Sequence, residues 1–192
     1  MVSTWSTTVE CTVIGVKRVK LGSAVAEKTI KTKRVFAGRL LKCDVVSVAL
    51  EKGKKSVREV VRHPGAAAAL CRTVDGRFVF VKQFRKAVEK QVLEIVAGTL
   101  EPGENPSACA RREVREETGY RVSALKKLGV VYPSPGYSDE RLHVYLADLR
   151  KTRGETDHDH DERIKTVHIS RAGVEKKIAS GSISDAKTLA AW

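Results

Sequence analysis

The sequence lacks the patterns that mark a membrane-spanning helix or a small zinc or redox motif. No apolar run in its 192 residues approaches the roughly 20 that a helix needs to cross a bilayer. There is no C-x-x-C pair, because the cysteines are widely separated, which argues against a structural zinc site. Cys71 and Cys109 lie in apolar or helical patterns, so we expect reduced thiols and a cytoplasmic protein with no membrane partner.

The N-terminus also lacks the charged-then-apolar layout of a secretory signal. Residues 1–34 are basic and rich in Ser and Thr, a bias that transit peptides share. Their apolar residues are largely β-branched, and such residues favour strands. The sequence therefore favours a basic, β-rich extension over a transit peptide.

Acidic residues are few, with 23 Asp and Glu against 36 Lys and Arg, which gives a formal net charge of +13. Basic chains often bind nucleic acid or anionic membranes. Here residues 1–65 contain 14 basic and 5 acidic side chains, so most of the surplus belongs to the N-terminal third. The rest of the chain is nearly balanced, and a nucleic-acid partner is not expected. The basic N-terminal third is expected at most to attract a small anionic substrate.

The periodicity indicates two domains, a β-rich region at 1–62 and a mixed α/β region at 63–192. In the first, strands are expected at 35–50 and 56–62, before the chain-breaking His63-Pro64-Gly65. In the second, a helix is expected from Asn105 to Gly119, since Asn is a good N-cap and Gly a common C-terminal stop. Further strands are expected at 66–72, 77–83, 91–97, 121–132, 141–149 and 163–169, and short helices near 171–180 and 184–191.

Three carboxylates share one face of the expected helix, because Glu113, Glu116 and Glu117 have i, i+3 and i+4 spacing. Like charges at this spacing repel one another, and either Arg112 or a divalent cation would relieve the repulsion. Carboxylate oxygens suit Mg²⁺, with Mn²⁺ as the alternative, and Glu104 can supply a further oxygen. A solvated acidic helix face is the simpler interpretation of the three glutamates alone.

The complete spacing from residue 98 to residue 120 resembles the Nudix box. Every defining position matches: Gly98, Glu104, Arg112, Glu113, Val114, Glu116, Glu117, Gly119 and Tyr120. The resemblance implies an α/β/α sandwich, the Nudix fold, with a small N-terminal antiparallel β domain beside it. It also implies a metal-dependent hydrolase that cleaves a nucleoside diphosphate linked to another moiety.

Segments outside the box are similar to those of ADP-ribose pyrophosphatases. They are His63-Pro64-Gly65-Ala66, Val81-Lys82-Gln83-Phe84-Arg85, Glu94-Ile95-Val96-Ala97-Gly98, Ser134-Pro135-Gly136 and residues 183–188. The resemblance implies hydrolysis of ADP-ribose or a related ADP-sugar to AMP and a sugar phosphate. It further implies a homodimer built through the N-terminal β domain.

The resemblance also assigns the site residues. The principal metal ligands would be Glu113 and Glu117, with Glu104 and Glu116 close by and the carbonyl of Ala97 completing the set. The catalytic groups would be Glu162 as general base, Glu116 and Arg112, with His160 as an alternative base because its pKa lies near the working pH. The substrate would contact Arg85 through its diphosphate, together with Arg58, Gly98, Leu100 and Pro135. Phe36 is an alternative to Arg58 for the adenine, since neither Trp5 nor Trp192 is at a matching position.

Two other interpretations remain open. One is a Nudix hydrolase of different specificity, for GDP-mannose, for a dinucleotide such as NADH or for an RNA 5′ end. The other is a non-catalytic Nudix module that binds ADP-ribose or nucleic acid. The complete carboxylate set argues against the second, and no helix-turn-helix segment is visible.

Overall fold

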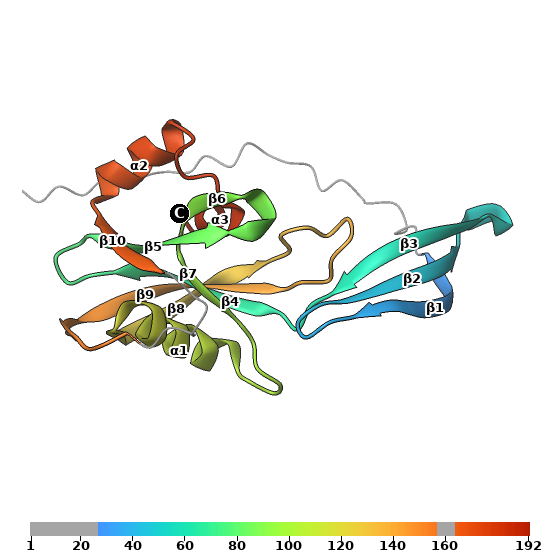
Figure 1. Ribbon diagram of the computed structural model, residues 1–192, viewed down its shortest axis with the longest axis horizontal. Coiled ribbons are helices and arrows are strands. Elements are labelled where there is room, and N and C mark those ends of the chain that lie inside the picture. Colours follow the sequence, from blue (N-terminus) through green and yellow to red (C-terminus); the bar gives the residue numbers. More distant parts are fainter. Residues whose placement is uncertain (1–26, 157–163) are drawn as a thin grey trace, which may run out of the picture.

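The computed structural model describes residues 27–156 and 164–192 and contains two β-sheets (Figure 1). The smaller sheet is antiparallel, in the order β1 (Lys28–Ala37), β2 (Lys42–Ala49) and β3 (Lys55–Arg62). The expected single strand over 35–50 was wrong. A turn interrupts it, in which the Gly38 N–H donates to the Leu41 carbonyl at 2.8 Å. The short 3-10 helix Glu51–Gly53 joins β2 to β3.

The larger sheet is mixed and has seven strands. Its central order is β10-β5-β4-β9-β8, in which β4 and β9 run parallel and the other neighbours run antiparallel. β6 pairs with β5, and β7 pairs with β4. The strand bounds are β4 (Ala66–Arg72), β5 (Phe78–Arg85), β6 (Lys90–Glu94), β7 (Val96–Thr99), β8 (Tyr120–Val131), β9 (Leu142–Arg153) and β10 (Lys165–Ile169).

The β4–β5 hairpin separates soon after its turn, and this separation positions the glycine of the box. β4 and β5 pair only at Cys71 with Val79 and at Arg72 with Phe78. Beyond that point β7 takes the free edge of β4, so that Gly98 lies opposite Ala67. The start of the box is thereby fixed to a strand whose alanines are buried.

Helices cover both faces of the larger sheet, and the alternation of β4 explains why. Its even-numbered residues pack toward α2 (Arg171–Ala179) and α3 (Ala186–Ala191), and its odd-numbered residues pack toward α1 (Pro106–Thr118). Because most of these residues are alanine, helices can approach the strand closely on either side. The expected α/β/α sandwich beside a small antiparallel sheet is confirmed (Figure 1).

The end of the smaller sheet is tied to the loop between β8 and β9. The Val61 N–H donates to the Tyr137 carbonyl at 2.7 Å, and the His63 N–H donates to the Asp139 carboxylate at 2.9 Å. Arg62 pairs with the same carboxylate at 3.1 Å. The loop that contains Pro135 is therefore held against the junction of the two sheets. No helix in the described ranges is long and apolar enough to cross a membrane.

Candidate active site

The helix that carries the glutamates has a defined start and end. At its start the Asn105 side chain accepts a hydrogen bond from the Ser107 N–H at 2.9 Å, and Pro106 occupies the first turn. At its end Gly119 adopts a left-handed conformation, with φ of 72°, and its N–H donates to the Arg115 carbonyl at 2.8 Å. Since both ends are fixed, the carboxylates keep their predicted common face.

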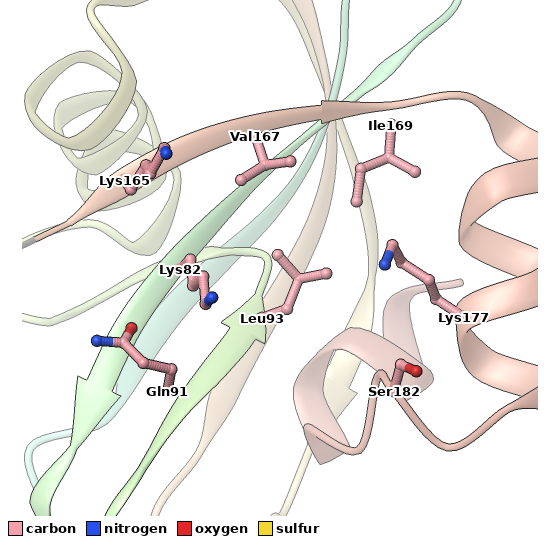
Figure 2. A pocket seen from close by; sticks show the side chains of 8 residues that line it. All are labelled: Lys82, Gln91, Leu93, Lys165, Val167, Ile169, Lys177 and Ser182. Atoms are coloured by element: carbon pink, nitrogen blue, oxygen red, sulfur yellow. The ribbon is translucent and has the colours of Figure 1, made fainter.

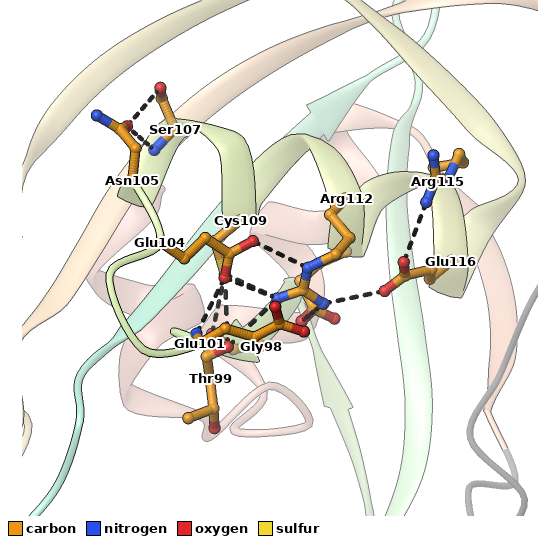
Figure 3. Close-up of polar contacts among 11 residues, drawn as sticks. Gly98, Thr99, Glu101, Glu104, Asn105, Ser107, Cys109, Arg112, Arg115 and Glu116 are labelled. Atoms are coloured by element: carbon orange, nitrogen blue, oxygen red, sulfur yellow. Dashed lines mark hydrogen bonds and ion pairs between the residues drawn. The ribbon is translucent and has the colours of Figure 1, made fainter.

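The Arg112 guanidinium lies at the centre of these carboxylates (Figure 3). Its Nε and Nη2 each donate to Glu104 at 3.0 Å, a two-pronged contact. Its Nη1 donates to Glu113 at 2.6 Å and to Glu116 at 3.0 Å. The Arg112 side chain therefore connects three acidic side chains and offsets part of the repulsion predicted between Glu113 and Glu116.

The ionisation of the cluster follows from these contacts. Hydrogen bonds from Arg112, against an opposing effect of burial, lower the pKa of Glu104 to about 2. Hydrogen bonding to Glu104 and the charges of its neighbours raise the pKa of Arg112 above its usual value. Burial, followed by the charge of Glu104, raises the pKa of Cys109 to about 12. At neutral pH, Glu104 is therefore ionised, and Cys109 is a neutral thiol.

Gly98 allows Glu113 to lie directly against the β7 backbone. A Cβ at position 98 would overlap the Glu113 carboxylate, so any side chain there must displace it. Glu117 points toward the sheet and is only 6% exposed. Its charge adds to the effect of burial in raising the pKa of the Cys71 thiol. The two glutamates that the resemblance assigns as principal metal ligands are thus both held on the sheet side of α1.

The glutamate oxygens of the box are the kind of ligand that a hard divalent cation prefers. Their positions, however, do not surround a single point. The four glutamates at defining positions of the box, Glu104, Glu113, Glu116 and Glu117, supply oxygen, and Gly98 leaves room for the Glu113 carboxylate against β7. Within residues 27–156 and 164–192, no three His, Cys, Asp or Glu side chains are placed to hold one ion together. Instead, Arg112 holds Glu104, Glu113 and Glu116.

A cavity of about 300 Å³ opens beside the start of the box. Ala97 and Gly98 line it from β7, and Arg85 and Lys187 contribute positive charge. Its other lining residues include Thr99, His63, Pro133, Glu140 and Asp185. The cavity therefore combines the predicted diphosphate-binding arginine with the backbone that precedes the carboxylate helix.

Glu94 contacts both positively charged side chains of this cavity, Arg85 and Lys187. It is 2% exposed and accepts a two-pronged contact from Arg85, at 2.8 and 2.7 Å. Lys187 of α3 also contacts Glu94, and it contacts Asp185 at 3.0 Å. Burial alone would raise the pKa of Glu94, but the hydrogen bonds from Arg85 and the charge of Lys187 together lower it. Sequence reasoning assigned no role to Glu94 or Lys187, which lie 93 residues apart.

Other predicted site residues lie elsewhere. Arg58 is on β3, where its guanidinium bonds to Glu27 and to Ser56. Leu100 lines a different cavity, of about 560 Å³, together with residues of the smaller sheet. Pro135 is in the β8–β9 loop, and Pro133 rather than Pro135 lines the cavity beside Gly98. Glu162 and His160, the two candidates for the general base, lie outside the described residues.

Comparison with known proteins identifies a matching family model and several similar proteins. The NUDIX domain model matches residues 61–190. The chain is 42% identical to an ADP-ribose pyrophosphatase of Bacillus subtilis, over 86% of the chain and 90% of that protein. It is 41% identical to a methanol dehydrogenase activator of Bacillus methanolicus, over 89% and 93%. A GDP-mannose pyrophosphatase of Cronobacter sakazakii is 35% identical, over 68% and 76%.

Among solved structures, one titled as an ADP compounds hydrolase superposes with a TM-score of 0.75. The superposition covers 86% of this chain and 89% of that one, at 21% sequence identity. At that identity the match supports the fold alone.

Proposed function

The chain belongs to the Nudix family of hydrolases, and from this membership we propose that it hydrolyses the pyrophosphate bond of ADP-ribose, releasing AMP and ribose 5-phosphate. The observation that carries the proposal is the 42% identity to an ADP-ribose pyrophosphatase over nearly the whole of both chains. The GDP-mannose pyrophosphatases are more distant, at 34–35% identity over shorter stretches. NADH and RNA 5′ ends remain alternative substrates, and a non-catalytic module is disfavoured by the complete carboxylate set.

In the proposed reaction, Glu113 and Glu117 would hold a divalent cation, with Glu104, Glu116 and the Ala97 carbonyl close by. Such a cation, Mg²⁺ or Mn²⁺, neutralises phosphate charge and lowers the pKa of the attacking water when bound. Arg112 contacts Glu104, Glu113 and Glu116 and keeps these three carboxylates close together.

We assign binding of the diphosphate to Arg85, whose planar guanidinium matches two phosphate oxygens. The buried Glu94 holds the arginine toward the cavity through paired contacts, and Lys187 adds a second positive charge. The general base is assigned to Glu162, with His160 as the alternative, and this assignment rests on the resemblance alone. Arg58, Gly98, Leu100 and Pro135 keep their proposed substrate contacts on the same ground.

We further propose that the protein is a cytoplasmic homodimer. The smaller sheet exposes large apolar side chains at Ile30, Val35, Phe36 and Val57, each more than half exposed. Pairing of two copies through this sheet would bury them, in line with the family resemblance. The three described cysteines are free thiols, which suits a reducing compartment.

A substrate panel tests the proposed reaction. Wild-type protein is assayed with ADP-ribose, GDP-mannose and NADH, with Mg²⁺ or with excess EDTA, and products are identified by chromatography. We expect ADP-ribose to have the highest kcat/KM, AMP to appear in equal amount to ribose 5-phosphate, and EDTA to stop turnover. A higher kcat/KM for GDP-mannose, or turnover that survives EDTA, would refute the proposal.

The role of Arg85 is tested with Arg85→Gln and, as a control, Arg77→Gln. Arg77 is a surface residue paired with Asp75 on the β4–β5 turn. Loss of a charge-assisted phosphate contact is expected to lower kcat/KM by about tenfold or more for Arg85→Gln. The control should retain wild-type kinetics, and equal effects of the two substitutions would contradict the assignment.

A further inference from the structure

A third cavity, of about 430 Å³, lies on the face of the larger sheet that α2 and α3 cover (Figure 2). Its lining comes from β5, β6, β10, α2 and the turn after α2, and consists of Lys82, Gln91, Leu93, Lys165, Val167, Ile169, Lys177 and Ser182. None of these residues lines the cavity beside Gly98 or contacts Arg112. It is therefore separate from the candidate active site.

The charge of this cavity is positive. Lys82 and Lys165 are directly opposite each other in the β5–β10 pairing, and like charges in that position destabilise a sheet. Lys177 adds a third ammonium group from α2. No Asp or Glu lines the cavity among the described residues, and none of the three lysines forms an ion pair there. The fold thus tolerates a repulsive arrangement that an anionic ligand would relieve.

The shape of the cavity and its uncharged side chains indicate which chemical groups an anionic ligand would have besides its negative charge. In Figure 2, Lys82 and Lys165 lie on one side of Leu93 and Val167, and Lys177 lies on the other. The apolar side chains between the lysines suit an apolar or planar group, and Gln91 and Ser182 offer hydrogen-bonding groups. An inorganic anion alone would leave this apolar part without a partner.

We propose that this cavity binds a nucleotide-class organic phosphate, with its phosphate on Lys82 and Lys165 and its base or sugar over Leu93 and Val167. A nucleic-acid strand would need a positively charged groove that follows its backbone. The three lysines instead surround a single concave site. This site is distinct from the proposed hydrolytic site, because none of the described residues that we assign to that reaction lines it.

Calorimetric titration with AMP tests the proposal. The wild type is compared with Lys82→Gln/Lys165→Gln/Lys177→Gln and with the control Lys126→Gln/Lys127→Gln/Lys151→Gln. The control removes the same charge from exposed lysines of β8 and β9 that line none of the cavities described above. We expect the first variant to lose one equivalent of bound AMP, or at least about tenfold in affinity for it, while the control retains wild-type binding.

Two further titrations, one of the Arg85→Gln variant and one with inorganic phosphate, exclude simpler explanations of AMP binding. Arg85→Gln should leave that equivalent of AMP unchanged, since Arg85 belongs to the other cavity. Inorganic phosphate should bind the site about tenfold more weakly than AMP, because it makes no contact with Leu93 or Val167. Unaltered AMP binding in the first variant, equal losses in both triple variants, or equal affinity for inorganic phosphate would each overturn the proposal. The single variant Lys82→Gln provides the same comparison if the triple variant does not fold.

Discussion

At the scale of single residues, Arg112 and Gly98 set the arrangement of the carboxylates. Arg112 contacts three glutamates at once, and Gly98 leaves space for the Glu113 carboxylate against β7. Both belong to the box that the sequence revealed, and the spacing predicted that the glutamates share a face. It did not predict that the arginine lies at their centre, since a helical pattern defines a face and not the direction of each side chain.

Gly98→Ala should impair activity without unfolding the protein. The added Cβ displaces the Glu113 carboxylate, and a shift of about 1 Å in a catalytic group can cost about 100-fold in rate. The free energy of unfolding should change by less than about 1 kcal/mol, because the displaced group is the end of a long side chain. Gly136→Ala, where a Cβ meets nothing within 4 Å, is the control. Near-wild-type turnover by Gly98→Ala would contradict this account.

Glu104 should contribute stability that depends on pH. Its pKa in the folded state, about 2, lies below its ordinary value of 4.5. The stabilisation is therefore complete above pH 4.5 and is lost as the pH falls toward 2. We expect Glu104→Gln to unfold at lower denaturant concentration than wild type at pH 7, and the difference to shrink between pH 4.5 and 2. A difference that stays constant over this range would exclude the ion pair as its cause.

At the scale of elements, the position of α1 depends on the turn that follows it. Gly119 ends α1 and begins the path to β8, and its left-handed conformation brings it against the end of β9. The Gly154 N–H donates to the Gly119 carbonyl at 2.8 Å. This contact fixes the C-terminal end of the carboxylate helix to the sheet.

Gly119→Ala should therefore destabilise the protein more than Gly103→Ala does. Both glycines have positive φ, so each alanine variant incurs a similar conformational cost of about 1 kcal/mol. Only at position 119 does the new Cβ overlap the Gly154 carbonyl, whereas nothing lies within 4 Å at position 103. Denaturant unfolding of the two variants measures the difference. Equal destabilisation would show that the contact with Gly154 is unimportant.

Most elements of the larger sheet could be predicted from the sequence, and the contacts between distant elements could not. The Asn105 cap and the Gly119 stop gave α1 to within a residue or two, because capping is local. The turn at 38–41 was missed, since apolar residues continue on both sides of it. The Glu94–Lys187 contact joins β6 to α3, and nothing local to either residue indicates its partner.

At the scale of the whole molecule, the smaller sheet extends away from the layers that contain the candidate active site (Figure 1). It carries exposed apolar side chains and much of the positive charge counted in the first 65 residues. The division of the chain at residue 62 stays a prediction. The arrangement supports a role for this sheet in association between copies of the chain.

Phe36→Glu should weaken the proposed dimer. Phe36 is 55% exposed on β1, and burial of a glutamate in an apolar interface is unfavourable. Val74→Glu is the control, because Val74 is 70% exposed on the turn between β4 and β5. Analytical ultracentrifugation should find wild type and control as dimers, with Phe36→Glu shifted toward monomer. A monomeric wild type would contradict the proposed assembly.

The central claim is that the glutamates of α1 support metal-dependent hydrolysis of ADP-ribose. It is tested most directly by kcat/KM for ADP-ribose with Mg²⁺ in wild type, Glu117→Gln and Glu175→Gln. Glu175 is an exposed residue of α2 paired with Arg171, so its variant controls for the loss of a surface carboxylate. We expect Glu117→Gln to lower kcat/KM by at least about 100-fold and Glu175→Gln to leave it unchanged. Full activity of Glu117→Gln would contradict the claim.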